Sequence, residues 1–316
     1  MTERLPTLAD IEAARARIEG KVKRTPVMRS AVLEAEAGAA ALCFKCENLQ
    51  EVGAFKARGA ASAVFALSDA EAARGVVTHS SGNHGAALAW AAALRGIAAH
   101  VVMPSTATAA KQANTARYGA RIVLCEPTLA AREAAAARLA EETGAVFVHP
   151  YDDPAVIAGQ GTCALELLEQ APELDLVLAP IGGGGLISGT ATAVKGRAPA
   201  TRVVGVEPAG ADDALRSLLA GVLIPMERPD TIADGLRASL SERTFAVIAR
   251  RVDDIVTVSD AEIVLAQRAL WEALRMLIEP SAAVPYAAIR AGRIDVRGLR
   301  VGIILTGGNA EALSVS

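Results

Sequence analysis

The sequence has few aromatic residues and few cysteines. Phe, Trp and Tyr together make up 3% of the 316 residues, so aliphatic and small side chains must form the core. The four cysteines are too few for a disulfide framework in so long a chain. Cys43 and Cys46 have the spacing of a metal or redox motif, but residues three apart in a strand point to opposite faces. We therefore predict that both are small buried side chains.

Long apolar runs and an excess of charge are also absent. No apolar run reaches the roughly 18 residues that a membrane-spanning helix needs, and the acidic N-terminal residues are unlike a signal peptide. We therefore expect a cytoplasmic protein without a membrane partner. The formal net charge is -3, which argues against a general attraction to nucleic acids, so we also expect no nucleic-acid partner.

The chain does contain the composition and pattern of a globular α/β protein. Hydrophobic residues make up 52% and charged residues 21%, and the length is sufficient for two domains. Short apolar runs alternate with helical patterns, which is typical of parallel sheets covered by helices on both faces. The predicted strands are residues 41–46, 76–78, 98–103, 121–125, 145–148, 174–181, 202–207, 255–258 and 301–305.

Lysine is scarce, and one lysine stands in an unusual position. Six lysines occur in the chain, and Lys56 follows Gly53 and Phe55 at the start of an alanine-rich helical pattern. Burial favours the neutral, nucleophilic amine of lysine, which is the group that forms a Schiff base with an aldehyde cofactor. A lysine at a helix start that reaches solvent explains this stretch equally well.

Four consecutive glycines, residues 182–185, separate a predicted strand from a predicted helix. Such a loop lets backbone N–H groups and a helix amino end approach a phosphate, whereas a tight turn needs only one or two glycines. Glu207, about 20 residues on, is placed like the ribose-binding acid of a dinucleotide fold. The G-x-G-x-x-G spacing fails, however, because Ile187 or Ser188 occupies the third glycine position. A single phosphate therefore fits better than a dinucleotide.

Two further polar loops follow predicted strands, where ligands of α/β proteins bind. Residues 80–84, Ser-Ser-Gly-Asn-His, offer hydroxyl, amide and backbone donors that suit a substrate carboxylate, although an ordinary helix cap has the same residues. Residues 207–213 hold three carboxylates, which suit a hard cation such as magnesium or calcium. An acidic helix start favoured by the helix dipole is the alternative.

These stretches together resemble the serine/threonine dehydratase and serine racemase family. The stretches are KCENLQ at 45–50, GAFK at 53–56, SSGNH at 80–84, GGGG at 182–185 and TGGN at 306–309. The family has the tryptophan synthase β-subunit fold, fold type II of the pyridoxal 5'-phosphate enzymes. The resemblance implies a large cofactor-binding domain of residues 1–65 and 147–316 and a small domain of residues 66–146, with the cofactor in the cleft between them.

The resemblance also implies a role for each matching residue. Lys56 would hold pyridoxal 5'-phosphate and remove the substrate α-proton, and Ser81 would lie on the opposite face of the ring. The implied cofactor-binding residues are Phe55, Lys56, Asn83, Gly182, Gly183, Gly184, Gly185, Leu186 and Thr306. The implied substrate-binding residues are Ser80, Ser81, Gly82, Asn83, His84 and Arg132. The implied ligands of a divalent cation (Mg, Ca or Mn) are Glu207, Asp213 and the carbonyl of Ala211.

One departure from the family leaves the substrate side chain open. The common Gly-Ser-Phe-Lys motif is Gly-Ala-Phe-Lys at residues 53–56, as in hydroxyaspartate dehydratases and some microbial serine racemases. Arg132 matches an arginine near the substrate mouth and would pair with a second carboxylate, or it is a solvated helix arginine.

We predict an ammonia-lyase that eliminates water from threonine, serine or 3-hydroxyaspartate to give a 2-oxo acid and ammonia. The alternatives are an amino-acid racemase, a β-replacement synthase and, from another class, a dinucleotide-dependent oxidoreductase. The implied partners are a small amino-acid substrate and a second copy of the chain in a homodimer.

Overall fold

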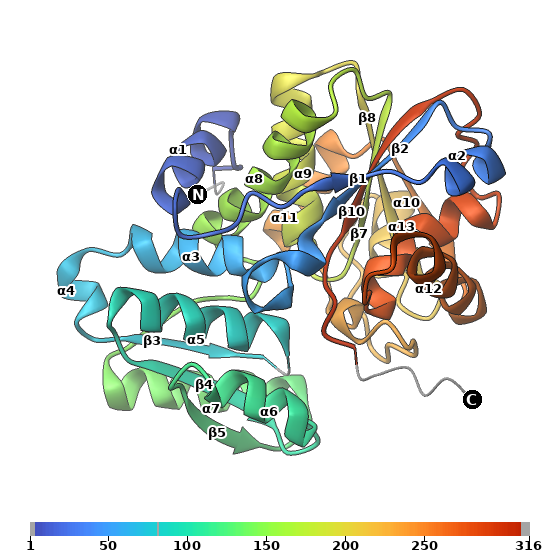
Figure 1. The fold of residues 1–316 in the computed structure, drawn as a ribbon. Helices are drawn as coiled ribbons and strands as arrows, with labels where there is room; N and C mark the ends of the chain where they lie inside the picture. Colours follow the sequence, from blue (N-terminus) through green and yellow to red (C-terminus); the bar gives the residue numbers. More distant parts are fainter. Residues whose placement is uncertain (1–3, 81, 311–316) are drawn as a thin grey trace.

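A computed structural model of the chain describes residues 4–80 and 82–310, which contain two sheets (Figure 1). The six-stranded sheet has the order β1-β2-β10-β7-β8-β9, and the four-stranded sheet has the order β5-β4-β3-β6. All neighbouring strands are parallel except β1 and β2. The strands are β1 (Val27–Met28), β2 (Ala41–Cys46), β3 (Val76–His79), β4 (Ala99–Pro104), β5 (Arg121–Cys125), β6 (Val146–Phe147), β7 (Leu176–Pro180), β8 (Arg202–Pro208), β9 (Asp254–Val258) and β10 (Arg300–Leu305).

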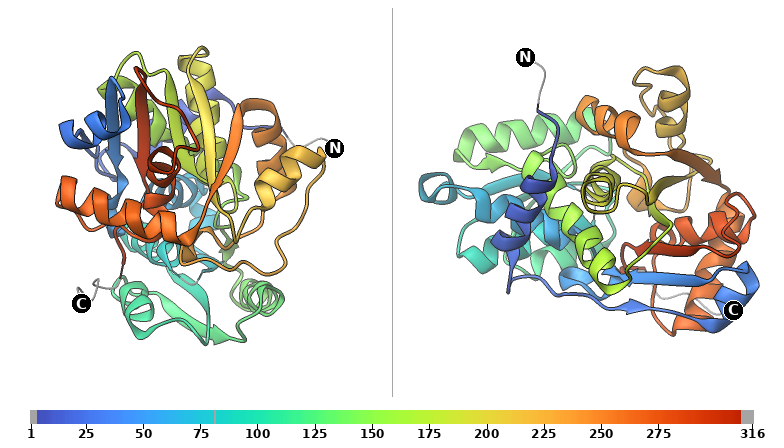
Figure 2. Two further views of the ribbon diagram at one scale, coloured as in Figure 1. Left: turned by 90° about the vertical axis from the view of Figure 1, so that its right-hand side faces the viewer. Right: turned by 90° about the horizontal axis from the view of Figure 1, so that it is seen from above.

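Helices cover both sheets, and each sheet with its helices forms a domain (Figure 2). The α-helices are α1 (Leu8–Ile18), α2 (Ala31–Ala37), α3 (Lys56–Ala66), α4 (Asp69–Ala72), α5 (Asn83–Arg95), α6 (Ala109–Ala116), α7 (Leu129–Thr143), α8 (Pro154–Gln170), α9 (Gly185–Arg197), α10 (Asp213–Ala220), α11 (Glu242–Arg251), α12 (Asp260–Leu274) and α13 (Pro280–Arg290). Short 3-10 turns are η1 (Glu47–Leu49), η2 (Glu51–Gly53) and η3 (Asp234–Leu236). We propose that the domain boundaries lie at residues 66 and 146.

The predicted α/β fold is confirmed. Every strand predicted from the sequence is present, with ends that differ by at most two residues. The short antiparallel strand β1 was not predicted, because two residues are too few to show a periodic pattern.

Local sequence signals explain several element ends. α1 begins with a capping box in which the Thr7 hydroxyl accepts from the Asp10 backbone N–H, and the Asp153 side chain caps α8 by accepting from backbone N–H groups of its first turn. α5 ends at Gly96, whose φ of 72° costs a glycine nothing because it has no Cβ atom.

β2 carries the hydrophobic core on both of its faces. Leu42 and Phe44 pack with Cys46 and residues of α12 and α13, whereas Cys43 packs with residues of α1, α8 and α9. Cys43 and Cys46 therefore face opposite sides of the sheet, and both are buried and free, as predicted.

α3 joins the two domains. It packs against α8 on the side of the six-stranded sheet and against α5 on the side of the four-stranded sheet. In the left view of Figure 2 the four-stranded sheet (green) lies beneath the six-stranded sheet. Lys56, the first residue of α3, therefore lies where the two domains meet.

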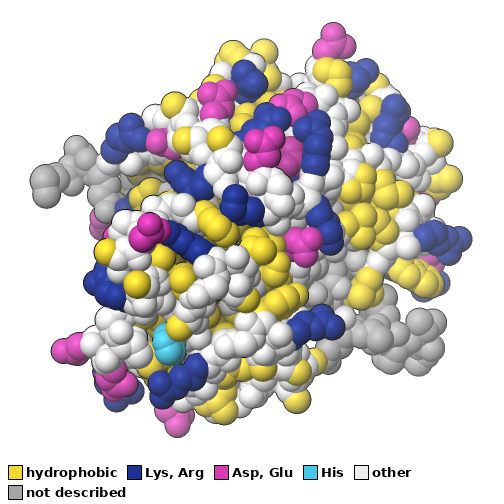
Figure 3. All heavy atoms as spheres, turned by 60° about the vertical axis from the view of Figure 1, so that its left-hand side comes forward, with side chains coloured by type: hydrophobic (Ala, Val, Ile, Leu, Met, Phe, Trp, Pro, Cys, Tyr) yellow, Lys and Arg dark blue, Asp and Glu magenta, His cyan; other side chains and the backbone are white. Residues whose placement is uncertain are grey.

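The surface carries charges of both signs. Basic and acidic side chains are interspersed on the face shown in Figure 3, which agrees with the small formal net charge of -3. Among residues 4–80 and 82–310, none of the helices combines the length and the hydropathy that crossing a bilayer requires.

Candidate active site

The loop that carries Lys56 is joined to the loop that follows β10. The backbone N–H of Phe55 donates to the Thr306 carbonyl at 2.9 Å, and the N–H of Gly308 donates to the Gly53 carbonyl at 3.0 Å. The predicted stretches 53–56 and 306–309 are thus side by side, because β2 and β10 are parallel neighbours and end at the same edge of the sheet.

The amine of Lys56 is held by the segment before α8. Its Nζ donates to the Pro150 carbonyl at 2.8 Å and lies 5.1 Å from the centre of the Phe55 ring. Burial lowers the pKa of the amine to about 8, although the Glu279 carboxylate partly opposes this shift. Lys56 is therefore more easily deprotonated than a solvated lysine.

The loop of four glycines has no room for side chains of its own. An added Cβ would lie 2.4 Å from the Tyr151 ring at Gly183 and 3.0 Å from the Tyr151 Cβ at Gly185. At Gly184 it would lie 2.7 Å from the Thr244 Cβ, and φ is +84°. The loop ends at the amino end of α9, where the helix dipole attracts anions.

Lys56 and the glycine loop therefore meet at one short segment. Pro150 accepts the hydrogen bond of the Lys56 amine, and its neighbour Tyr151 packs on Gly183 and Gly185. The sequence did not single out Tyr151. It carries no local pattern, and only its position in the fold brings it between the two predicted stretches.

Asn83 connects the loop after β3 to the other domain. Its Nδ2 donates to both carboxylate oxygens of Glu279, at 3.1 and 3.2 Å, and its Oδ1 accepts from Asn309 at 2.8 Å. Burial raises the pKa of Glu279 to about 7. Glu279 was not among the predicted site residues, because an acid between an isoleucine and a proline shows no local pattern that points to a site.

The remaining residues predicted to bind the substrate are divided between buried and accessible positions. The Ser80 hydroxyl accepts from the Gly82 N–H at 3.2 Å. His84 is buried, and burial holds its pKa well below 6.5, so its ring is neutral. Ser81 lies outside the described residues.

Arg132 lies in the first turn of α7. Its Nε donates to the Thr128 carbonyl at 3.4 Å. Burial raises the pKa of Tyr151 to about 12, and the charge of Arg132 partly opposes the shift. Burial also lowers the pKa of His79 to about 4, with help from His149 and Arg132. Arg132 is thus near enough to act electrostatically on Tyr151 and His79.

The predicted cation ligand Glu207 lies near the end of β8, and Asp213 is the first residue of α10. Glu207 accepts from the N–H groups of Ala214 and Leu215, at 3.1 and 2.9 Å. Burial, with a contribution from the Asp213 carboxylate, raises the pKa of Glu207 to about 8. In the part of the chain that the structure describes, no group of three or more His, Cys, Asp or Glu side chains is arranged to hold a metal ion.

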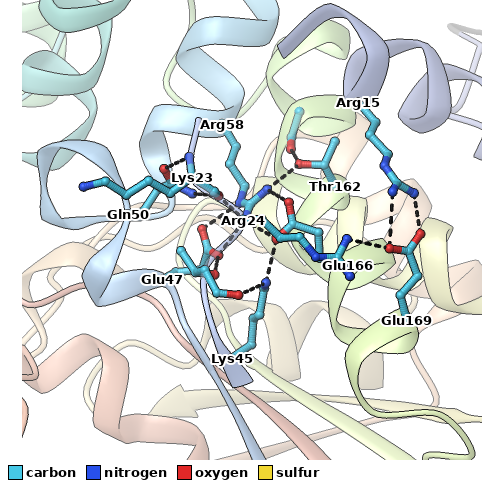
Figure 4. A network of polar contacts seen from close by, with 12 residues as sticks. Arg15, Lys23, Arg24, Lys45, Glu47, Gln50, Arg58, Thr162, Glu166 and Glu169 are labelled. Atoms are coloured by element: carbon cyan, nitrogen blue, oxygen red, sulfur yellow. Dashed lines mark hydrogen bonds and ion pairs between the residues drawn. The ribbon is translucent and has the colours of Figure 1, made fainter. Parts of the chain in front are cut away.

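Arg58, two residues after Lys56, is the centre of a buried polar network that the sequence did not predict (Figure 4). Its guanidinium donates to both oxygens of Glu47, at 2.7 and 2.8 Å, and to both oxygens of Glu166, at 2.7 and 2.8 Å. Lys45 also donates to Glu166, at 2.6 Å. The network joins α3, whose first residue is Lys56, to β2, η1 and α8.

A family model described as "Pyridoxal-phosphate dependent enzyme" matches residues 18–307, which is most of the chain. The chain belongs to this family of pyridoxal-phosphate-dependent enzymes. The predicted family and the predicted cofactor are confirmed, and nothing supports the dinucleotide-dependent alternative.

Relatives of this pyridoxal-phosphate-dependent enzyme include lyases and racemases. It is 53% identical over 307 residues to the beta-hydroxyaspartate dehydratase of Paracoccus denitrificans (strain Pd 1222), covering 97% of each chain. It is 44% identical to the L-threo-3-hydroxyaspartate ammonia-lyase of Saccharomyces cerevisiae (strain ATCC 204508 / S288c), covering 97% of this chain and 94% of the yeast protein. The structure of maize serine racemase superposes with a TM-score of 0.96 at 46% identity, covering 98% of this chain and 95% of the other.

The residues of the enzyme fit its cofactor. The Thr306 hydroxyl is buried and has no hydrogen-bond partner among the described residues, and a buried hydroxyl without a partner calls for a ligand. The glycine loop at the amino end of α9 is suited to bind the phosphate. The Lys56 amine, whose pKa is lowered, is suited to react with the aldehyde.

Proposed function

We propose that the enzyme is an ammonia-lyase that eliminates water from a β-hydroxy-α-amino acid, with 3-hydroxyaspartate as the preferred substrate. The observation that carries the proposal is the meeting of the Lys56 amine and the glycine loop at Pro150 and Tyr151. The relatives that are hydroxyaspartate lyases support the choice of substrate.

Bound pyridoxal 5'-phosphate supplies an aldehyde that reacts with amines and a ring that withdraws electrons from the α-carbon. Gly182 to Gly185, with the Leu186 amide, would bind its phosphate. Phe55 would pack against the ring, Asn83 would donate to the phenolic oxygen, and the neutral Thr306 hydroxyl would face the pyridine nitrogen. A hydroxyl at that place does not enforce a ring cation, which suits β-elimination.

Lys56 moves the proton in this mechanism. With a pKa of about 8, roughly a tenth of the amine is neutral at pH 7, so it can accept the α-proton of the substrate. The α-proton and the β-hydroxyl are lost together as one water, and hydrolysis of the resulting enamine by a second water gives the 2-oxo acid and ammonia. The loop of Ser80, Ser81, Gly82, Asn83 and His84 binds the substrate α-carboxylate.

A panel of stereoisomers of serine, threonine and 3-hydroxyaspartate tests the proposal. We expect ammonia and 2-oxo acid to form in equal amounts, and fastest from one stereoisomer of 3-hydroxyaspartate. Racemisation is the second candidate, supported by the similarity to maize serine racemase. It would be favoured if the opposite enantiomer of serine formed faster than the 2-oxo acid.

Arg132 binds the second carboxylate in this proposal. Arg132→Ala should lower kcat/KM for 3-hydroxyaspartate by about 10- to 100-fold, because a charge-assisted hydrogen-bond pair is lost, and should leave kcat/KM for serine nearly unchanged. Arg138→Ala, an exposed arginine of the same helix, is the matched control. An equal loss of kcat/KM for both substrates would refute the proposed role of Arg132.

We also propose that Glu207, Asp213 and the Ala211 carbonyl bind magnesium, calcium or manganese. The two buried carboxylates support this, since a cation would offset their burial. Each ion, tested in turn at a hundred times its dissociation constant, should stabilise the chelator-treated protein by about 2.7 kcal/mol. Thermal unfolding measures this, and Glu207→Gln should abolish the effect. Equal melting temperatures with and without every ion would refute the site.

The enzyme is further proposed to act as a homodimer in the cytoplasm. Light scattering coupled to size exclusion should then give twice the chain mass of 32.4 kDa.

A further inference from the structure

Four groups form a hydrogen-bonded row that ends at Glu279. The Asn309 Nδ2 donates to the Val52 carbonyl at 2.8 Å and to the Asn83 Oδ1 at 2.8 Å. The Asn83 Nδ2 then donates to both oxygens of Glu279, at 3.1 and 3.2 Å. Asn83 follows β3 of the four-stranded sheet, whereas the other three residues flank strands or helices of the six-stranded sheet.

The two ends of the row fix the direction of every amide in it. A backbone carbonyl accepts hydrogen bonds and cannot donate them, and the ionised form of Glu279 likewise only accepts. The Val52 carbonyl can therefore accept only from the side-chain nitrogen of Asn309. This nitrogen, in turn, can donate only to the side-chain oxygen of Asn83. Glu279 requires the nitrogen of Asn83 from the other side. Both ends thus demand the same orientation of the Asn83 amide.

The backbone is strained at Val52, the other end of the row, in the loop that precedes Lys56. Val52 has a φ of 55°, a left-handed conformation that β-branched residues rarely adopt and that clusters at functional sites. A Cβ on the next residue, Gly53, would lie 2.6 Å from the Asn309 Oδ1. The loop before Lys56 therefore bends at Val52, and its next residue is a glycine at the point where the Asn309 side chain approaches.

We propose that Asn309 and Glu279 are positioning residues that orient the Asn83 amide toward the cofactor. Both oxygens of Glu279 meet the same nitrogen, so they share one of its hydrogens and leave the second for the phenolic oxygen of the cofactor. Without this row the amide can turn over and place its carbonyl oxygen against that oxygen. The inference rests on the proposed role of Asn83.

Charged groups from several elements surround Glu279. Lys56 of α3 interacts with it electrostatically, as do Asp234 of η3 and Lys111 of α6, which also form an ion pair with each other. Glu279 is 7% exposed, whereas Asn309 is exposed. Substitutions at Asn309 therefore test the row with the least risk to folding.

Asn309→Asp and Asn309→Ala separate orientation from mere packing. Aspartate accepts only, so it repels both the Val52 carbonyl and the Asn83 oxygen and favours the turned amide. Alanine removes a donor and leaves Glu279 to hold Asn83. We expect the apoenzyme of Asn309→Asp to bind pyridoxal 5'-phosphate at least about tenfold more weakly than that of Asn309→Ala, measured by absorbance titration after removal of the cofactor with hydroxylamine. Equal affinities of the two variants would overturn the proposal.

The double variant Asn309→Asp, Glu279→Gln adds a readout that a purely structural role would not move. The introduced glutamine amide can donate to the turned Asn83 carbonyl, so the melting temperature of the apoenzyme should recover relative to Asn309→Asp alone. Cofactor affinity should stay low, because the carbonyl still faces the phenolic oxygen. Recovery of both quantities would overturn the inference. Asn83→Ala is the reference variant: if it binds cofactor like the parent enzyme, the proposed role of Asn83 fails instead.

Discussion

Lys56→Ala is expected to abolish both covalent retention of the cofactor and lyase activity. The substitution removes the amine that reacts with the aldehyde and the base that takes the α-proton. Loss of a positioned base alone lowers turnover by about 10²- to 10⁴-fold, and loss of the nucleophile adds to this. Absorbance of the purified protein and mass spectrometry after borohydride reduction measure the covalent link, and ammonia release measures turnover.

Lys21→Ala is the matched control for this experiment. The Lys21 amine donates to the Arg17 carbonyl of its own helix region at 3.0 Å and takes no part in the site. This variant should keep the cofactor colour and the activity of the parent enzyme. A Lys56→Ala protein that still carried covalently bound cofactor and released ammonia from 3-hydroxyaspartate would refute the proposed function.

Arg58→Met should produce the largest loss of stability. Burial alone would raise the pKa of Glu47, but Arg58 holds it below its usual value, so Glu47 is ionised and depends on this arginine. Methionine fills similar volume and leaves two buried carboxylates, Glu47 and Glu166, without their main donor. Removing one partner of a buried ion pair costs about 3–5 kcal/mol. Chemical denaturation of the apoenzyme measures the loss.

Arg268→Met is the control for this substitution. Arg268 pairs with Glu272 at 2.8 Å on an exposed face of α12, where solvent screening leaves an ion pair little effect on stability. If the free energy of unfolding fell by similar amounts in the two variants, the buried network would not be a major source of stability for α3.

Patterns with a short period were readable in the chain. All strands except β1 were predicted from short apolar runs, which are continuous where a strand is fully buried, as in β7 and β10. Cys43 and Cys46 were assigned correctly because side chains alternate along a strand. The loops at 182–185 and 306–309 were recognisable because glycine is rare where a side chain fits.

The contacts of the site were not readable in this way. Nothing near Tyr151 in the sequence predicts that its ring packs on the glycines, and nothing near Arg58 predicts that Glu166 lies opposite. These pairs are distant in the chain, and Arg58 meets Glu166 only because α3 and α8 pack side by side. A residue that acts through a partner of this kind has no periodicity that could reveal it.

The sequence by itself determined the alternation of strands and helices, the family, and the residue types available to the cofactor, because these depend on neighbours within a few positions. The tertiary structure decided which of those residues meet. It lowers the pKa of Lys56 by burial. It also brings Glu279 and Asn83, from different domains, within hydrogen-bond distance, and it leaves the Thr306 hydroxyl without a partner among the described residues. Burial and hydrogen-bond satisfaction are properties of the packed chain, since each depends on atoms that folding alone brings together.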